Sequence, residues 1–261
     1  MTNMKRYLSL AGLVCAAVAT GCSYDKNAVQ DITGPLPASA VKFFNFGIGA
    51  PAVNFYANDT KITAITSATG AESTTGVGVG GAGNGGLYNG LAGGSYTFTG
   101  KISAATDKNL AISPLQAQIA DGKYYSYYIS GFYNTTSKSA ESFIVEDPLP
   151  AVDQDNAYVR FVNASPNSSP MVLNVTATTG GAVTAIGSAV AYKGAGGFVA
   201  IPGGNYNLAT RTAGGSTDVI TRAAVAFAAG RVYTIAARGD ITLPSSGTAA
   251  NRSQLDNTLN R

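Results

Sequence analysis

Acidic side chains gather in one short stretch near the middle of the chain. Glu146 and Asp147 are followed, after five intervening residues, by Asp153 and Asp155. Calcium takes six to eight oxygen ligands in proteins, and an Asp-x-Asp step can supply several of them. We therefore consider a calcium site at these four acids. The alternative is that they are solvated charges of a linker, which is the commoner role of such residues.

Two tyrosines are candidates for stacking on a sugar ring. Alternation along a predicted strand puts Tyr125, Tyr127 and Ile129 on one face, which we assign to the core. Tyr124 and Tyr128 then point away from that core, and an exposed aromatic pair can bind a glycan. The alternative is that both rings pack beside a neighbouring strand or under a glycine-rich loop, since tyrosine is common in strands.

The chain contains no histidine. Ser-His-Asp and Cys-His nucleophile systems and His-ligated zinc or iron sites are therefore excluded. Ser39 and Lys42 have the S-x-x-K spacing of serine acyltransferases, but they fall at the start of a predicted strand and not on a helix. Residues 78–83 have the spacing G-x-G-x-x-G, yet no βαβ context or P-loop lysine accompanies them. We predict no enzymatic activity and no cofactor, because an enzyme built on carboxylates alone would have only the four linker acids.

The start of the chain has the pattern of an export signal. Lys5 and Arg6 precede an apolar stretch, residues 8–19, whose twelve positions are too few to span a bilayer. The stretch ends in A-T-G-C, and small residues before a cysteine resemble a lipoprotein cleavage motif, with Ala19 where leucine is usual. We predict a signal peptide over residues 1–21 and a lipid on Cys22. The alternative is ordinary cleavage that leaves Cys22 as a free thiol.

Cleavage before Cys22 determines several properties of the mature chain. Cys15 would leave with the signal, so no disulfide is expected. The protein would be exported and anchored in the bacterial cell envelope, at the outer membrane, by lipid and not by a spanning helix. Removal of Lys5 and Arg6 leaves 15 basic residues against 14 acidic ones. Nucleic-acid binding needs a clustered basic surface, so we exclude nucleic acid as a partner.

The second half of the chain repeats the first in four places and in the same order. V-K-F-F-N at 41–45 matches V-R-F-V-N at 159–163, and P-A-V at 51–53 matches P-M-V at 170–172. G-G-S-Y-T-F at 93–98 matches G-G-N-Y-N-L at 203–208, and D-G-K-Y-Y-S-Y at 121–127 matches A-G-R-V-Y-T-I at 229–235. Gly-Gly before alternating apolar residues is a turn and strand signal. The repeat therefore consists of folding signals.

The repeat and the composition together predict two all-β domains. Only 12% of residues are charged, and 32 glycines and 14 tyrosines favour strands and tight turns. We expect a lipidated cysteine and tether over 22–38, a first β-sandwich over 39–147 with a flexible glycine-rich loop at 74–90, and a linker over 148–156. A second β-sandwich follows over 157–242. Residues 243–261 are a polar tail in which the sequence has no strand or turn pattern, and we leave its structure unassigned.

One family resemblance supports this organisation. The run V-R-F-V-N-A-S-P-N-S-S-P at 159–170 resembles V-R-F-V-H-A-S-P-D-A-P, the opening of a widespread bacterial extracellular domain of unknown function. I-P-G-G-N-Y at 201–206 and A-G-R-V-Y-T at 229–234 resemble its L-P-A-G-x-Y and A-G-x-x-Y-T elements. The resemblance implies tandem immunoglobulin-like or transthyretin-like antiparallel β-sandwiches on secreted or anchored proteins, and it implies no activity. Asn163 stands where that family often has histidine.

The sequence therefore predicts a non-catalytic, lipid-anchored cell-envelope or surface protein that serves adhesion, scaffolding or interaction. The alternative is a glycan-binding or small-ligand-binding surface lipoprotein that feeds an outer-membrane partner. The expected partners are the membrane, through the lipid on Cys22, and a protein or glycan at the surface.

Overall fold

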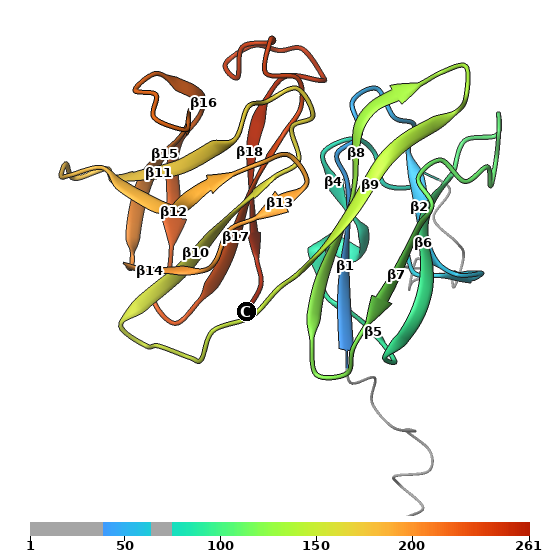
Figure 1. Ribbon diagram of the computed structural model, residues 1–261, viewed down its shortest axis with the longest axis horizontal. Coiled ribbons are helices and arrows are strands. Elements are labelled where there is room, and N and C mark those ends of the chain that lie inside the picture. The colour runs from blue at the N-terminus through green and yellow to red at the C-terminus, as the bar shows by residue number, and fades with distance from the viewer. Residues whose placement is uncertain (1–38, 64–74) are drawn as a thin grey trace, which may run out of the picture. The chain divides into compact units, whose positions relative to one another are not determined.

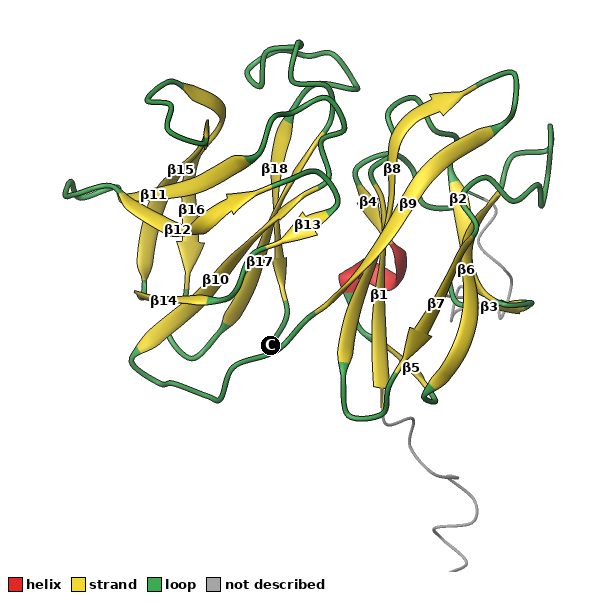
Figure 2. Cartoon of the chain, viewed as in Figure 1, coloured by secondary structure: helices red, strands yellow, loops and turns green. Residues whose placement is uncertain are grey.

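The computed structural model describes residues 39–63 and 75–261. Outside the described residues lie the predicted signal peptide, Cys22 and the tether up to residue 38. Thr74, where the predicted glycine-rich loop begins, lies outside them as well. Strands joined by turns and loops make up nearly all of the described chain, and one short helical turn is the only helix in it (Figure 2). Within this part of the chain, no helix has the length and apolarity needed to cross a membrane.

The described residues of the first half form nine strands and one 3₁₀ turn (Figure 1). The strands are β1 (Ser39–Asn45), β2 (Val53–Ala57), β3 (Thr60–Lys61), β4 (Gly81–Ala82), β5 (Asn89–Leu91), β6 (Gly94–Ile102), β7 (Leu115–Ile119), β8 (Tyr124–Asn134) and β9 (Ser139–Glu146), and the turn is η1 (Gly83–Gly86).

The second half also folds into nine strands. They are β10 (Asn156–Asn163), β11 (Met171–Ala177), β12 (Thr184–Val190), β13 (Gly194–Ala195), β14 (Val199–Pro202), β15 (Gly204–Thr212), β16 (Asp218–Phe227), β17 (Val232–Arg238) and β18 (Gln254–Leu259).

The two halves have the same topology. In the first half, the sheet β4-β1-β8-β9, to which β5 adds beside β1, faces the sheet β3-β2-β6-β7. In the second half, β13-β10-β17-β18, to which β14 adds beside β10, faces β12-β11-β15-β16. Each strand of the first half therefore has an equivalent strand at the same place in the sheets of the second half. The prediction of an all-β chain with two tandem sandwiches is therefore confirmed.

One pairing in each sandwich is parallel, although antiparallel sheets were predicted. β1 pairs parallel to β8, and β10 pairs parallel to β17. The remaining ladders between strands are antiparallel. A parallel pair needs a long connection, and here the opposite sheet of the sandwich supplies it.

Each sandwich closes around its own apolar core. Phe43, Phe55 and Tyr127 belong to the first core, and Phe161 and Leu173 belong to the second. The predicted core face of β8 is confirmed, since Tyr125, Tyr127 and Ile129 all lie in the first core. The central strands are buried on both faces because their outer faces form a third apolar cluster, described below.

The predicted flexible loop at 74–90 is instead part of a sheet in its described portion. β4 and β5 both pair antiparallel with β1, and β13 and β14 take the same places beside β10. A Cβ on Gly81 would lie 2.9 Å from the carbonyl oxygen of Gly78, and one on Gly194 would lie 2.9 Å from that of Ala191. Glycine is used here because the backbone approaches itself closely.

The polar tail, left unassigned from the sequence, contains the edge strand β18, so the predicted end of the second sandwich at residue 242 is wrong. Six residues of β18 pair with β17, and Leu255 lies in the second core with 2% of its surface exposed. The sequence signal was hidden because alternate positions, Asp256 and Thr258, belong to the outer face of the sheet. The second sandwich therefore extends to Leu259.

Replacing Leu255 with alanine should destabilise the second sandwich. We expect the free energy of unfolding to fall by about 2–5 kcal/mol, as for other buried leucines. Leu259→Ala is the matched control, because that side chain is 49% exposed. Urea denaturation followed by circular dichroism measures both, and an equal, small effect for the two variants would contradict the placement of β18.

Candidate functional site

The two sandwiches contact each other through the outer faces of their five-stranded sheets. The buried apolar residues of this contact form one cluster, whose members are Phe44, Phe46, Tyr128, Phe143, Val162, Ala164 and Ala236. The ring of Tyr128 stacks on Phe44 at 4.8 Å and on Phe143 at 4.9 Å between centroids. The described residues of both sandwiches accordingly belong to one compact unit.

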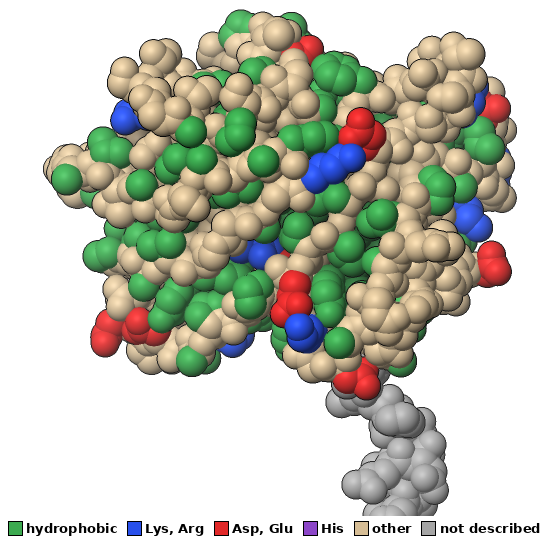
Figure 3. Space-filling view, viewed as in Figure 1, with side chains coloured by type: hydrophobic (Ala, Val, Ile, Leu, Met, Phe, Trp, Pro, Cys, Tyr) green, Lys and Arg blue, Asp and Glu red, His purple; other side chains and the backbone are tan. Residues whose placement is uncertain are grey.

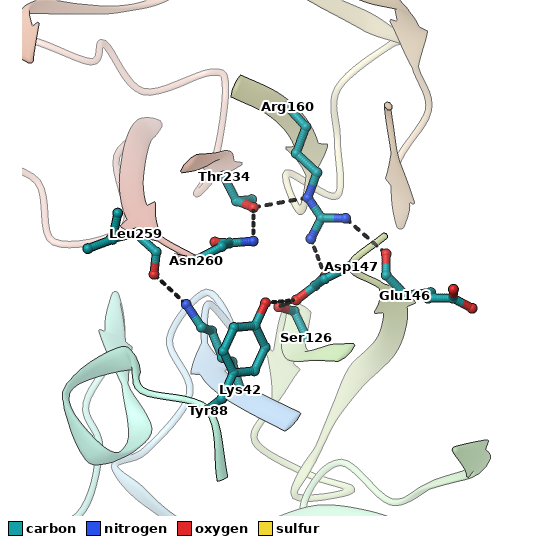
Figure 4. A network of polar contacts seen from close by, with 9 residues as sticks. All are labelled: Lys42, Tyr88, Ser126, Glu146, Asp147, Arg160, Thr234, Leu259 and Asn260. Atoms are coloured by element: carbon teal, nitrogen blue, oxygen red, sulfur yellow. Dashed lines mark hydrogen bonds and ion pairs between the residues drawn. The ribbon is translucent and has the colours of Figure 1, made fainter. Parts of the chain in front are cut away.

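A buried ion pair lies beside this apolar cluster. The guanidinium of Arg160, on β10, pairs with the carboxylate of Asp147, which follows β9 (Figure 4). Both side chains are fully buried. Arg160 also donates from Nε to Thr234 Oγ1 at 2.9 Å and from Nη1 to the carbonyl oxygen of Glu146 at 2.9 Å. Each of the three guanidinium nitrogens, Nε, Nη1 and Nη2, thus donates to an acceptor although the group is removed from water.

The carboxylate of Asp147 has further donors within the first sandwich. Its Oδ2 accepts from Tyr88 Oη at 2.6 Å and from Ser126 Oγ at 2.8 Å. Burial, and then the charge and hydrogen bond of Asp147, raise the pKa of Tyr88 well above its usual range. The phenol is therefore a permanent donor to this carboxylate.

A second cation lies on the equivalent strand of the first sandwich. Lys42, on β1, is 1% exposed, and its Nζ donates to the carbonyl oxygen of Leu259 at 2.6 Å. The same Nζ lies 4.3 Å from the centroid of the Tyr88 ring. Burial lowers the pKa of Lys42 to about 8, although the charge of Asp147 opposes this shift.

We call this set the clasp: Lys42, Tyr88, Ser126, Glu146, Asp147, Arg160, Thr234, Leu259 and Asn260, the residues drawn in Figure 4. A buried lysine with a lowered pKa beside a carboxylate is also found in active sites. Here, however, Lys42, Asp147 and Arg160 are each at most 1% exposed, and each is bonded to other groups of the protein. The arrangement suits the joining of two domains, and these three side chains are closed off from solvent.

The structure does not bring the four predicted calcium ligands together. Asp147 is in the clasp, whereas Glu146 Oε2 pairs with Lys123 Nζ at 2.7 Å. Asp153 accepts from the backbone N–H of Asp155 and from Asn156 Nδ2, each at 2.9 Å, and these bonds lower its pKa. Among the described residues, no three acidic, histidine or cysteine side chains group as a metal would require.

The two predicted sugar-stacking tyrosines have different surroundings. Tyr124 is 40% exposed, and its ring meets that of Tyr88 edge to face at 5.0 Å. Tyr128 is 1% exposed, because the second sandwich covers the outer face of β8. Tyr128 points away from the core of its own sandwich as predicted, but the two rings do not form an exposed pair for a sugar.

The clasp was missed by the sequence analysis, although a signal for it was present. Lys42 and Arg160 occupy the same place in V-K-F-F-N and V-R-F-V-N, where a cation interrupts an otherwise apolar strand in both halves. A basic residue on a strand that is apolar on both faces must find a partner in the interior. On the face of the molecule in Figure 3, by contrast, lysine and arginine side chains occur singly or beside acidic ones.

By its fold, the chain belongs to the tandem β-sandwich proteins, with a buried polar contact between its two sandwiches. It belongs to the family described as a domain of unknown function, DUF4397, whose model matches residues 39–174. The match begins at β1, covers the first sandwich and ends within β11 of the second.

Comparison with solved structures gives matches to nine chains. One is the crystal structure of a leucine-rich repeat protein from Bacteroides thetaiotaomicron, with 12% sequence identity and a TM-score of 0.19. The match covers 77% of this chain and 26% of that chain, so this chain spans about a quarter of the length of that protein. No curated protein matches the chain.

Replacing Arg160 with methionine should strongly destabilise the protein, because it leaves the carboxylate of Asp147 buried without its counter-charge. We expect the free energy of unfolding to fall by about 3–5 kcal/mol. Arg211→Met is the matched control, since it breaks the partly exposed pair with Asp218 and should cost about 0–1 kcal/mol. Adding Asp147→Leu to Arg160→Met should restore much of the loss. Equal effects of the two arginine substitutions would contradict a buried pair.

The stability contributed by Lys42 should depend on pH. Its pKa is about 8 when folded and has the ordinary value of 10.5 when unfolded, so between these values the unfolded chain binds the additional proton. Stability relative to Lys42→Met should therefore rise as pH increases from about 7.5 to 9.5, before unfolded tyrosines ionise. Chemical denaturation of both proteins across this interval measures the difference, and a difference that is constant with pH would contradict the lowered pKa.

Proposed function

We propose that the protein is a non-catalytic, lipid-anchored component of the bacterial cell envelope, and that its two sandwiches serve adhesion, scaffolding or interaction. The family itself is one of unknown function, so the proposal depends on the chemistry of this chain. Its expected partners are the membrane, through Cys22, and a protein or glycan at the cell surface.

The proposal is supported by the bonds that the clasp residues make within the protein. The groups best suited to chemistry are Lys42, Tyr88, Asp147 and Arg160. Lys42 and Arg160 bond to groups of the other sandwich, and Tyr88 donates to Asp147 within the first. A catalytic group must reach its substrate, and these groups hold two domains together instead. The absence of histidine in the sequence removes the commonest general base.

The anchor is proposed from the start of the chain. Cys22 follows a charged and then apolar signal pattern, and sixteen residues separate it from β1 at Ser39. A segment of that length reaches at most about 55 Å when fully extended. Such a tether would let the sandwiches stand clear of the lipid surface and meet a partner there.

Replacing Cys22 with alanine tests the anchor. In cells fed an alkyne fatty acid, the wild-type protein should acquire the label and enter the detergent phase on phase separation, and Cys22→Ala should do neither. Cys15→Ala is the matched control, because Cys15 is predicted to leave with the signal peptide, and it should behave as the wild type. Equal labelling of Cys22→Ala and the wild type would refute anchoring through this residue.

A further inference from the structure

The strand registers define which residues of the two sandwiches are equivalent. Lys42 lies opposite Ser126 in the first sandwich, and Arg160 lies opposite Thr234 in the second. Lys42 and Arg160 are therefore equivalent, as are Ser126 and Thr234. In the same way, Glu146 opposes Tyr125 and Leu259 opposes Tyr233, which makes Glu146 equivalent to Leu259.

The polar contacts between the sandwiches are reciprocal under this equivalence. Arg160 of the second sandwich donates to the carbonyl oxygen of Glu146 in the first, at 2.9 Å. Lys42 of the first sandwich donates to the carbonyl oxygen of Leu259 in the second, at 2.6 Å. Each sandwich thus offers a cation on its central strand to the end of the other sandwich's edge strand (Figure 4).

The residues that follow Glu146 and Leu259 in the sequence are also equivalent, and they make equivalent contacts. Asp147, after Glu146, accepts from Ser126 Oγ at 2.8 Å, and Asn260, after Leu259, donates from Nδ2 to Thr234 Oγ1 at 3.0 Å. The side chain that follows each edge strand is therefore held by the equivalent hydroxyl group of its own sandwich.

Contacts further along the strands are equivalent as well. Ser130 Oγ donates to the carbonyl oxygen of Ala164 at 3.0 Å. The residue equivalent to Ser130 is Arg238, whose guanidinium lies 5.6 Å from the ring centroid of Phe46, the residue equivalent to Ala164.

Six of the seven residues of the apolar cluster occupy equivalent positions, and the seventh, Phe143, is equivalent to Asp256. Three pairs of equivalent residues belong to it, namely Phe44 with Val162, Phe46 with Ala164, and Tyr128 with Ala236. When position i of one unit contacts position j of another while j contacts i, the interface is of the two-fold kind found in symmetric dimers.

We propose that the contact between the two sandwiches is a pseudo-two-fold interface, in which equivalent positions make reciprocal contacts, and that the two sandwiches associate without the linker. The partner that fits the outer face of each five-stranded sheet is accordingly another sandwich of this same fold. The linker raises the effective concentration of the two surfaces and contributes no contact that the interface requires.

Differences between equivalent residues make the first sandwich specific for the second. The first carries the large side chains Phe44, Phe46 and Tyr128, and two first sandwiches would bring these rings against one another. The second carries small side chains at those positions. It also has Asn260 where the first has Asp147, so two second sandwiches would bury Arg160 without a carboxylate. Repulsion and unpaired charge therefore disfavour both self-pairings.

Cleavage of the linker tests the proposal in the full-length protein. A site for a sequence-specific protease is inserted at Val152, which is 59% exposed, and the purified protein is cut and passed over a size-exclusion column at low micromolar concentration. Both fragments should elute together, at the volume of the uncut protein. Fragments that elute separately, or that precipitate after the cut, would overturn the proposal.

A second variant tests specificity by placing a tyrosine at position 236 of the second sandwich, where the equivalent residue of the first sandwich is Tyr128. Ala236→Tyr, combined with the cleavable linker, should separate into two fragments after the cut, each with the far-ultraviolet circular dichroism of β structure. Val183→Phe is the control, since it adds a ring at an exposed position that is not part of the apolar cluster, and its fragments should stay together. Co-elution of the Ala236→Tyr fragments would refute the role assigned to side-chain size.

Discussion

The guanidinium of Arg160 is fully buried, and a charge removed from water must be matched by charge and hydrogen bonds or the fold loses several kcal/mol. Its partners are Asp147 and the carbonyl oxygen of Glu146, at the end of the first sandwich, and Thr234 in the second. When the two sandwiches are in contact, Arg160 is therefore satisfied by groups of the first sandwich together with Thr234 of its own. The burial of this one group couples the two domains.

The same constraint explains why strands of the two halves are apolar on both faces. One face of β1 and of β10 closes the core of its own sandwich, and the other face enters the shared cluster around Phe44 and Val162. Buried polar contacts fix the register of an apolar contact that could otherwise slide. Lys42 and Arg160 give this contact its orientation as well as its position.

The sequence predicted the fold better than the site, for physical reasons. Alternation in β8 and the turn signals before Tyr96 and Tyr206 depend on local chemistry, so they could be recognised without a structure. Tyr128 was correctly placed on the face away from the core, but alternation identifies the two faces of a strand and not what covers each, so the second sandwich over this ring was not predicted. β18 was missed because an edge strand with polar alternate positions looks like a tail. Asp147 was assigned to a linker because its partner, Arg160, belongs to the other domain, and a contact between two domains has no local sequence pattern.

The family assignment relates the chain to other proteins but implies no activity. The chain's buried charged and polar side chains bond to other groups of the protein. The account then depends on one claim, that the two sandwiches are energetically a single body. Differential scanning calorimetry of the mature protein tests this most directly. The account predicts one transition whose calorimetric and van't Hoff enthalpies agree, which independent domains do not give. Two resolved transitions, each with the enthalpy of one sandwich, would contradict it.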